Sequence, residues 1–278
     1  MMDHFHELSQ QCSKAATEKY STSFSSAIKL LHPDLRIPVF NIYGFVRFAD
    51  EIVDTFHQYN KTELLAEFKK DTYNAIKRGI SMNPILHSFQ LTVNKYQVSH
   101  DLIAAFFKSM EMDLSKATYN SKEYKDYIYG SAEVVGLMCL HVFTMHNPTQ
   151  FEKLKPFAAK LGSAFQKVNF MRDLHADVNG LGRRYFPELR NGELSADGKK
   201  KIESEVQSEF DEGYKGIRQL PRTCRLGVYV AYLYYMVLFR KIRGMSPEGV
   251  LNRRIRIPNP TKLSLLCYSY VRHQLNLI

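Results

Sequence analysis

Apolar residues recur along most of the chain three or four residues apart, which is the spacing of amphipathic α-helices. Helices are predicted over residues 4–18, 84–97, 99–116 and 195–217, among others. Asn60-Lys-Thr-Glu63 is a capping-box pattern, and Gly79 is placed to end the helix that it opens. The alternation that is typical of strands is nearly absent. The pattern predicts one all-α domain over residues 1–278, with roughly ten helices.

Two local patterns qualify this picture. A hydroxyl cluster at residues 21–26 interrupts the first helical pattern, and such a cluster is either an N-cap or a seat for an anion. A later helix, expected to start at Ser121 and to reach Met138, contains Gly130 and Gly136. Glycine inside a helix costs about 1 kcal/mol relative to alanine, so a packing or ligand reason is expected for both.

A polar stripe lies on the helix predicted around residues 157–177. Asn169, Asp173 and Asp177 are four residues apart, and Gln166 precedes them by three. Each step of four turns the helix by about 400° and rises about 6 Å, so these side chains project from nearly one face. Two carboxylates stacked in this way repel each other unless a cation lies between them. The stripe is therefore a candidate metal site.

A second stripe has the same form, because Asp50 and Asp54 are also four residues apart. A pair of acids at this spacing is more often a solvated helix face. Here, however, apolar residues precede both stripes and each stripe has its own arginine, Arg47 and Arg172. Charged groups on core-facing helices are costly unless they are paired or bind metal. Two such stripes facing each other would hold Mg²⁺ through oxygen ligands and retained waters. The ligand expected at such a metal site is a diphosphate.

Composition narrows the class of protein. The 278 residues, 45% hydrophobic and 24% charged, suffice for a sizeable core in one domain or at most two. The net charge of +10 favours polyanionic partners: nucleic acid, an acidic membrane surface or phosphorylated substrates. The four cysteines are far apart, as expected for reduced thiols in a cytosolic protein. No signal peptide is recognised, and the apolar run at residues 226–239 is too short to span a bilayer, which favours a buried core helix.

Six short motifs then connect the chain to a known family. They are Ser21-Thr-Ser23-Phe24, Tyr43-Gly-Phe-Val-Arg47-Phe-Ala-Asp50-Glu51-Ile-Val-Asp54, Tyr127-Ile-Tyr129-Gly130 with Val135-Gly136, Gln166-Lys-Val-Asn169-Phe-Met-Arg172-Asp173-Leu-His-Ala-Asp177, Gly182-Arg183-Arg184-Tyr185-Phe186-Pro187, and Asn252-Arg253-Arg254. In this order they make the chain resemble the squalene/phytoene synthase family, the head-to-head prenyl synthases, over nearly its whole length. The compact length and the last motif look most like bacterial phytoene synthases. One departure is Ala176, where relatives often carry an acid, so this stripe has one carboxylate fewer.

The resemblance implies an all-α isoprenoid synthase fold around a central cavity. It implies a prenyltransferase that needs Mg²⁺, with two or three ions expected. Two geranylgeranyl diphosphates would condense head to head, through prephytoene diphosphate, to phytoene in carotenoid biosynthesis. The alternative within the family is a squalene or dehydrosqualene synthase that uses two farnesyl diphosphates, with NADPH needed only for squalene. More remote alternatives are a helical metal phosphohydrolase, suggested by His100-Asp101, and a basic nucleic-acid-binding protein, although no segment resembles a recognition module.

The resemblance also implies roles for residues. The expected metal ligands are Asp50, Asp54, Asn169, Asp173 and Asp177, with Glu51 beside them. The expected substrate contacts are Ser21, Ser23, Arg47, Gln166, Arg172, Arg183, Tyr185, Tyr235 and Arg254; the arginines suit phosphate oxygens because their donors form a planar fork. Tyr43, Tyr127 and Tyr235 could steady a carbocation with their ring faces, while a plain core role fits Tyr235 equally well. Pocket depth is assigned to Ile28, Phe40, Val135 and Met138, and the role of Asp113 is left open.

A location follows from the chemistry of the substrates and from charge. Prenyl diphosphates and their hydrocarbon product are lipids, and the chain has a surplus of lysine and arginine. A cytoplasmic protein with peripheral contact to the cytoplasmic membrane face is therefore expected, with no nucleic-acid partner. The oligomeric state is not assigned.

Overall fold

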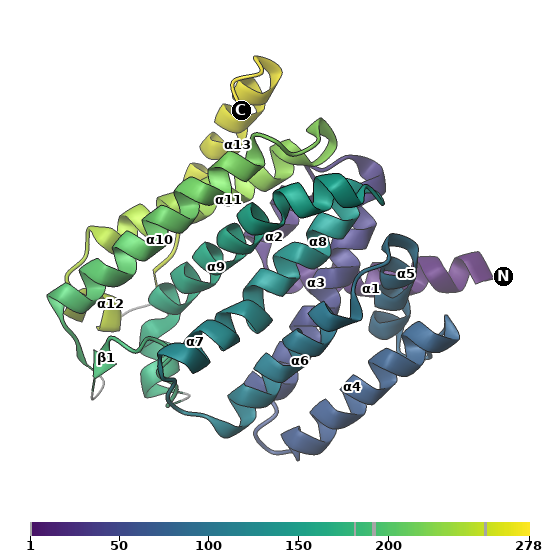
Figure 1. The fold of residues 1–278 in the computed structure, drawn as a ribbon, viewed down its shortest axis with the longest axis horizontal. Helices are drawn as coiled ribbons and strands as arrows, with labels where there is room; N and C mark the ends of the chain where they lie inside the picture. Colours follow the sequence, from purple (N-terminus) through teal and green to yellow (C-terminus); the bar gives the residue numbers. More distant parts are fainter. Residues whose placement is uncertain (1, 181, 191–192, 253–254) are drawn as a thin grey trace.

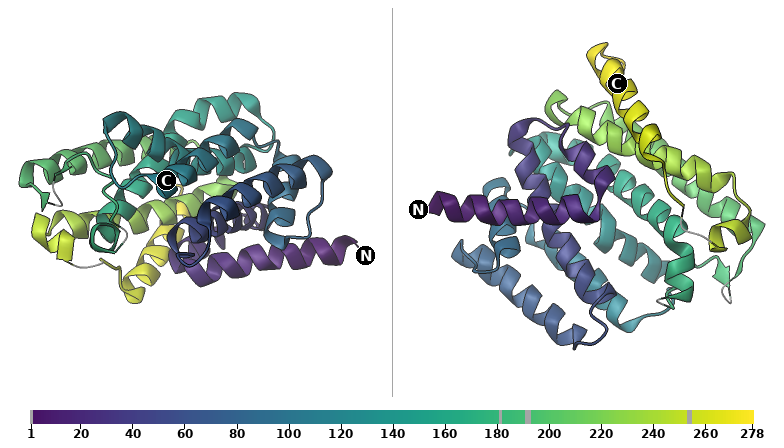
Figure 2. Two further views of the ribbon diagram at one scale, coloured as in Figure 1. Left: turned by 90° about the horizontal axis from the view of Figure 1, so that it is seen from below. Right: turned by 180° about the vertical axis from the view of Figure 1, so that it is seen from behind.

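A computed structural model describes residues 2–180, 182–190, 193–252 and 255–278. The helices follow one another as α1 (Met2–Tyr20), α2 (Thr22–Ile28), α3 (Pro33–Asp54), α4 (Lys61–Arg78), α5 (Pro84–Tyr96), α6 (His100–Ser115), α7 (Ser121–Ile128), the π-helical η1 (Tyr129–Glu133), α8 (Val134–Thr144), α9 (Pro148–Asn179), α10 (Ala196–Ile217), α11 (Arg222–Arg243), α12 (Pro247–Asn252) and α13 (Asn259–Gln274). They stack in layers, with α1 lying flat along the back of the molecule (Figures 1 and 2). The all-α prediction is confirmed.

The two helices that carry the acidic stripes run through the middle of the fold. Helix α3 buries a nearly continuous apolar face, and Phe45 on it stacks on Phe89 of α5 with ring centroids 3.9 Å apart. Helix α9 has 32 residues and packs along both α8 and α10. Both helices are anchored by apolar contacts along their length. Their polar side chains are therefore held in fixed positions.

The segment with the two glycines differs from the prediction. Asn120, not Ser121, is the N-cap, and it forms a capping box with Glu123. The segment is also not one regular helix, because η1 separates α7 from α8. A β-carbon on Gly130 would lie 2.5 Å from the carbonyl oxygen of Ala105 on α6. The glycine therefore has a packing reason: it allows the π-helical turn to approach the backbone of α6 closely.

Smaller features complete the fold. Ser21 is the N-cap of α2, since its side chain accepts a hydrogen bond from the Phe24 N–H at 3.2 Å. The apolar run 226–239 lies inside α11 and is largely buried, as predicted. A two-stranded antiparallel sheet, β1 (Leu189–Arg190) and β2 (Glu193–Leu194), and the short helix α12 were not predicted. Such two-residue strands carry too little alternation to be recognised in a sequence.

One helical segment among the described residues, Ser121–Thr144, is long and apolar enough to cross a membrane by length and composition alone. Within its most apolar window, 61% of the residues are buried inside the fold. Core helices pass the same test, and the contacts of α8 with α3, α6 and α9 fit that role.

Candidate active site

A cavity of about 530 Å³ lies among α2, α3, α8, α9, α10 and α11. This volume is within the range of small-molecule sites, about 300–1,000 Å³. Its polarity changes along α9: the lining side chains pass from Leu154 and Phe157 near the start of the helix to Asp173 and Asp177 near its end. The cavity thus joins a charged end to an apolar end, which suits a ligand with an anionic head and a hydrocarbon tail.

Most of the residues predicted to form the site line this one cavity. They are Ser21, Tyr43, Arg47, Asp50, Asp54, Tyr127, Gln166, Asn169, Arg172, Asp173, Asp177, Arg183, Tyr185 and Tyr235. Ser23 is half-buried and is not part of the wall, and Arg254 lies outside the described residues.

Two of the four residues that were expected to set the depth of the pocket line the cavity. Ile28 and Val135 line the cavity, but Phe40 and Met138 are buried in the apolar core instead. On α3 the cavity is lined by Val39 and Tyr43, four residues apart. Phe40, one residue after Val39, is turned by about 100° and so faces the core.

The first stripe is held by one arginine. The Arg47 guanidinium forms an ion pair with Glu51 and lies 3.8 Å from an Asp50 oxygen. It also stacks over the ring of Tyr20, 4.3 Å from the centroid. Burial raises the pKa of Asp50 to about 8, with repulsion from Asp54 the next cause, while Arg47 opposes the shift. Without a further cation, the Asp50 carboxyl therefore resists ionisation.

The second stripe is held by side-chain hydrogen bonds, one of which joins α9 to α11. The Tyr235 hydroxyl donates to Asn169 Oδ1 at 3.1 Å, and Asn169 Nδ2 donates to Gln166 Oε1 at 3.3 Å. Arg172 Nε donates to Asp173 Oδ2 at 3.0 Å. Burial raises the pKa of Asp177 to about 7, followed by repulsion from Asp173 and from Asp54 on α3. The repulsion between Asp177 and Asp54 means that the two stripes face the same space.

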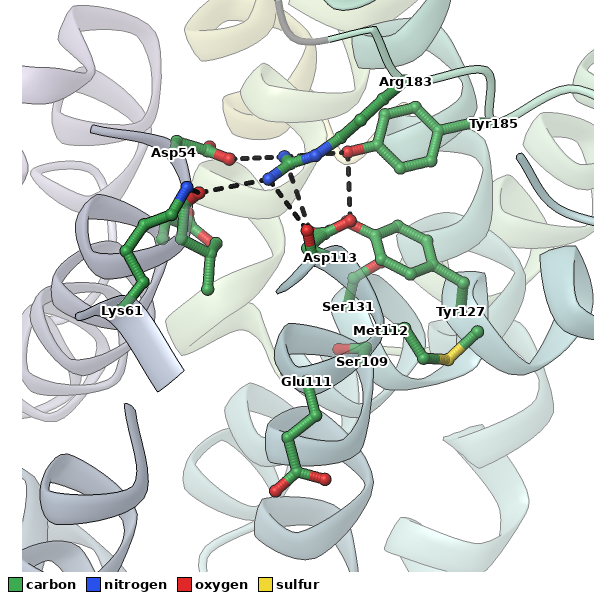
Figure 3. A network of polar contacts seen from close by, with 12 residues as sticks. Asp54, Lys61, Ser109, Glu111, Met112, Asp113, Tyr127, Ser131, Arg183 and Tyr185 are labelled. Atoms are coloured by element: carbon green, nitrogen blue, oxygen red, sulfur yellow. Dashed lines mark hydrogen bonds and ion pairs between the residues drawn. The ribbon is translucent and has the colours of Figure 1, made fainter. Parts of the chain in front are cut away.

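A buried polar network closes the charged end (Figure 3). Arg183 Nη1 donates to Asp54 Oδ1 at 2.6 Å and to the Tyr185 hydroxyl at 3.3 Å. Its Nη2 donates to the carbonyl oxygens of Val53 at 3.1 Å and Asp113 at 3.2 Å. Only 7% of the Arg183 side chain is exposed. This arginine therefore joins the loop after α9 to the C-terminal ends of both α3 and α6.

Asp113 is the hub of this network. Its carboxylate accepts hydrogen bonds from the hydroxyls of Tyr127 at 2.6 Å, Tyr119 at 2.9 Å and Tyr185 at 3.2 Å. Burial raises the pKa of Asp113 to about 6, while the Arg183 guanidinium and the Tyr127 hydroxyl oppose the shift. Sequence analysis left Asp113 open and missed Tyr119. The available signal in the sequence was the position of Asp113. It lies one turn beyond the apolar residues 102, 106 and 110, which form the buried face of α6.

The donor set fits Mg²⁺, although the protein alone does not complete a site. Among the described residues, no three aspartate, glutamate, histidine or cysteine side chains are grouped to hold a metal ion. Mg²⁺ usually takes one or two protein carboxylates and completes its octahedron with water and substrate phosphates. Burial and repulsion from neighbouring carboxylates raise the pKa values of Asp50 and Asp177, although Arg47 and Arg183 oppose the two shifts. Oxygen donors in this state suit a hard divalent cation that arrives with a diphosphate.

The raised pKa values predict a pH dependence for the Mg²⁺-free protein. The ordinary pKa of an aspartate carboxyl is 3.8, and folding raises it here. Such a carboxyl makes its full contribution to stability only below the ordinary pKa of 3.8. Its contribution is lost as pH rises through about 8 for Asp50 and about 7 for Asp177. We expect the melting temperature of Asp50→Asn, measured in chelator, to exceed the wild-type value at pH about 8. The excess should shrink toward pH about 5, and an excess that is independent of pH would contradict this prediction.

Comparisons with known proteins identify relatives along nearly the whole chain. Phytoene synthase 2 from Solanum lycopersicum is 28% identical over 284 residues, covering 96% of this chain and 91% of that protein. The 15-cis-phytoene synthase from Synechocystis sp. is 26% identical, covering 94% of this chain and 84% of that protein. Both alignments span nearly the whole chain, so the likeness is not confined to one motif.

Solved structures share the fold. A dehydrosqualene synthase in complex with a ligand superposes with a TM-score of 0.84 at 18% identity, covering 97% of this chain and 98% of that chain. Squalene synthase HpnC from Alicyclobacillus acidocaldarius gives a TM-score of 0.73 at 20% identity, covering 86% of this chain and 94% of that chain. The fold is that of isoprenoid synthases, as expected. The family model described as squalene/phytoene synthase matches residues 17–261. The chain therefore belongs to the squalene/phytoene synthase family.

Proposed function

We propose that this protein is a phytoene synthase, which condenses two geranylgeranyl diphosphates head to head through prephytoene diphosphate to phytoene. The observation that carries the proposal is a single cavity with two acidic stripes at one end and an apolar wall at the other. The two plant and cyanobacterial relatives above, both phytoene synthases by name, favour the geranylgeranyl substrate.

The charged end would bind the diphosphates. Asp50, Asp54, Asp173 and Asp177, with Asn169, would hold Mg²⁺, which when bound stabilises the negative charge that develops on the departing diphosphate. Arg47 and Arg172 already touch the stripes and are suited to orient phosphate oxygens. Arg47 Nε is buried and has no hydrogen-bond partner among the described residues, so this donor is available for a phosphate oxygen.

The aromatic wall would protect the carbocation. The ring of Tyr235 stacks on Phe165 with centroids 4.1 Å apart, and Phe24 lies 5.6 Å from Tyr43. These rings line the space between the acidic stripes and the apolar end. Ring faces stabilise a cation without donating a lone pair to it, and an apolar wall keeps water from capturing it.

Arg183 and Tyr127 take supporting positions in this proposal. Both Nη atoms of Arg183 already donate to protein acceptors, so this arginine would position Asp54 for Mg²⁺ more than it would hold phosphate. The Tyr127 hydroxyl donates to Asp113, which fixes the ring so that it forms part of the cavity wall. Asp113 would thus act on the reaction through the groups that it orients.

A second candidate is a squalene or dehydrosqualene synthase that takes two farnesyl diphosphates. The observation in its favour is the fold, because the two solved structures compared above are synthases of these kinds by name. The same charged end would serve either substrate, so the choice depends on the apolar end. Either enzyme would work in the cytoplasm beside a membrane that can take up its hydrocarbon product.

The test is a product assay. Purified protein is incubated with Mg²⁺ and either geranylgeranyl or farnesyl diphosphate, with and without NADPH, and the hydrocarbons are analysed. We expect phytoene from geranylgeranyl diphosphate, formed without NADPH and abolished by chelator. Squalene or dehydrosqualene as the main product would replace the first proposal by the second. Release of phosphate without a coupled hydrocarbon would overturn both.

A further inference from the structure

The positive charge of the chain is concentrated in its last quarter. Residues 213–278 contain 12 of the 38 lysines and arginines and a single acid, Glu248. Residues 1–212 contain the other 26 basic residues and 27 acids, so they carry a net charge of −1 against +11 for residues 213–278. This C-terminal part comprises the end of α10 together with α11, α12 and α13. The basic character of the protein therefore belongs to one region of the fold.

The cations of this region that the structure describes are mostly exposed, and few of them have an acidic partner. Lys215 pairs with Glu212, but among the described residues no other lysine or arginine beyond position 213 pairs with a carboxylate side chain. Arg240, Lys241 and Arg243 are exposed at the end of α11. Lys241 Nζ donates to the carbonyl oxygen of Arg256 at 2.9 Å, which ties the approach to α13 to this basic end. The charges are available for an anionic partner.

Helix α13 adds an apolar face that points outward. It packs on α11 (Figure 2). The Tyr234 hydroxyl on α11 donates to the carbonyl oxygen of Lys262 at 3.1 Å. Leu263, Tyr270 and Val271 are 63%, 51% and 55% exposed. Positions 263, 270 and 271 are seven and eight residues apart, so they share one face, and the exposed Cys267 lies between them. An amphipathic helix normally turns this face inward, and here it is turned away from the core.

We propose that α13 and the basic end of α11 form a docking surface for an anionic lipid bilayer. An amphipathic helix binds in the interface plane with its apolar face among the headgroups, and nearby Lys and Arg attract anionic lipids. Tyr268 and Tyr270, each 51% exposed, are of the type that concentrates at membrane interfaces. The occupant is a bilayer because it alone uses both features: nucleic acid would leave the apolar face unused, and a second copy would bring two strongly positive surfaces together.

The inference goes beyond the proposed reaction, because the surface would recognise lipid headgroups and not the prenyl diphosphate. It nevertheless determines where the cavity would lie relative to the bilayer. The face of α11 opposite to α13 contributes Val228, Ala231 and Tyr235 to the cavity wall. Docking through α13 would therefore hold the cavity one helix away from the bilayer.

The experiment is sedimentation of the full chain with vesicles of phosphatidylcholine, with and without phosphatidylglycerol. We expect binding only to the anionic vesicles, weakening with added salt. The charge variant is Arg240→Gln, Lys241→Gln and Arg243→Gln combined. Each charge contributes about fivefold to binding, so this variant should bind about 100-fold more weakly. The apolar variant, Leu263→Ser with Val271→Ser, should bind at least about tenfold more weakly.

The matched control removes three exposed charges on α4, at the opposite edge of the molecule (Figure 1). It combines Lys70→Gln, Lys77→Gln and Arg78→Gln, and vesicle binding should stay at the wild-type level. Equal losses in the control and charge variants would overturn the surface, as would failure of the wild type to bind anionic vesicles. Binding of duplex DNA or RNA in place of vesicles would overturn the choice of occupant. So would a dimer that dissociates in the apolar variant without any vesicle binding.

Hydrocarbon synthesis in detergent is measured in parallel, because docking and catalysis fail independently. Circular dichroism shows that each variant is folded. Normal synthesis with no vesicle binding would reject the docking surface alone. Vesicle binding with no synthesis would reject the proposed reaction alone.

Discussion

Replacing either Asp50 or Asp173 by asparagine is expected to lower turnover at least about 1,000-fold, equal to roughly 4 kcal/mol in the activation free energy. Each residue belongs to one of the two stripes at the charged end of the cavity. Asparagine keeps the shape and one oxygen but removes the negative charge that a hard divalent cation needs. The ion that stabilises the leaving diphosphate would then bind weakly and in the wrong place.

The fold should survive these substitutions. Burial raises the pKa of Asp50, and repulsion from Asp54, Asp113 and Glu51 adds to the shift, so a neutral asparagine relieves both costs in the Mg²⁺-free protein. We expect Asp50→Asn to be at least as stable as wild type in urea while it is inactive. Asp101→Asn, which changes an exposed acid in the first turn of α6, is the matched control and should keep full activity. Near-normal turnover of both stripe variants at saturating Mg²⁺ would refute the metal assignment.

The acidic stripes could be found in the sequence because each is a local pattern. A spacing of four residues fixes which side chains share a face of one helix, whatever the rest of the fold does. Other local patterns predicted the buried run in α11 and offered an N-cap in the hydroxyl cluster 21–26, a role that Ser21 takes in the structure. It also gave the all-α class, since apolar spacing is a property of each helix separately.

The network around Asp113 could not be found in this way, because it depends on tertiary contacts. Asp113 and Tyr185 are 72 residues apart, and Arg183 and Asp54 are 129 residues apart, so no spacing rule connects them. The reason for Gly130 had the same difficulty, because the carbonyl of Ala105 that leaves no room for a β-carbon there lies on another helix. Phe40 shows a related error: a buried apolar residue can face the core as well as the cavity.

Replacing Arg183 by glutamine is expected to destabilise the Mg²⁺-free protein by about 3–5 kcal/mol in urea unfolding. The guanidinium compensates the Asp54 and Asp113 carboxylates and satisfies the carbonyl oxygens of Val53 and Asp113. Glutamine is shorter and uncharged, so Asp113 would become a buried carboxylate with only tyrosine hydroxyls as partners. A buried charge that has lost its counter-charge is costly.

Two further variants test whether the loss of stability comes from the uncompensated charge: a double variant and a control at the neighbouring Arg184. Adding Asp113→Asn to Arg183→Gln removes the uncompensated charge, so the double variant should regain part of the lost stability, with a coupling of about 0.5–3 kcal/mol. Arg184→Gln, at a half-buried arginine with no ion pair among the described side chains, should change stability by no more than about 0.5 kcal/mol. An Arg183 that only bound diphosphate would give the opposite pattern. Arg183→Gln would then unfold like wild type in the absence of ligand, and only KM for the prenyl diphosphate would rise, because the residue would have no partner to lose until substrate arrived.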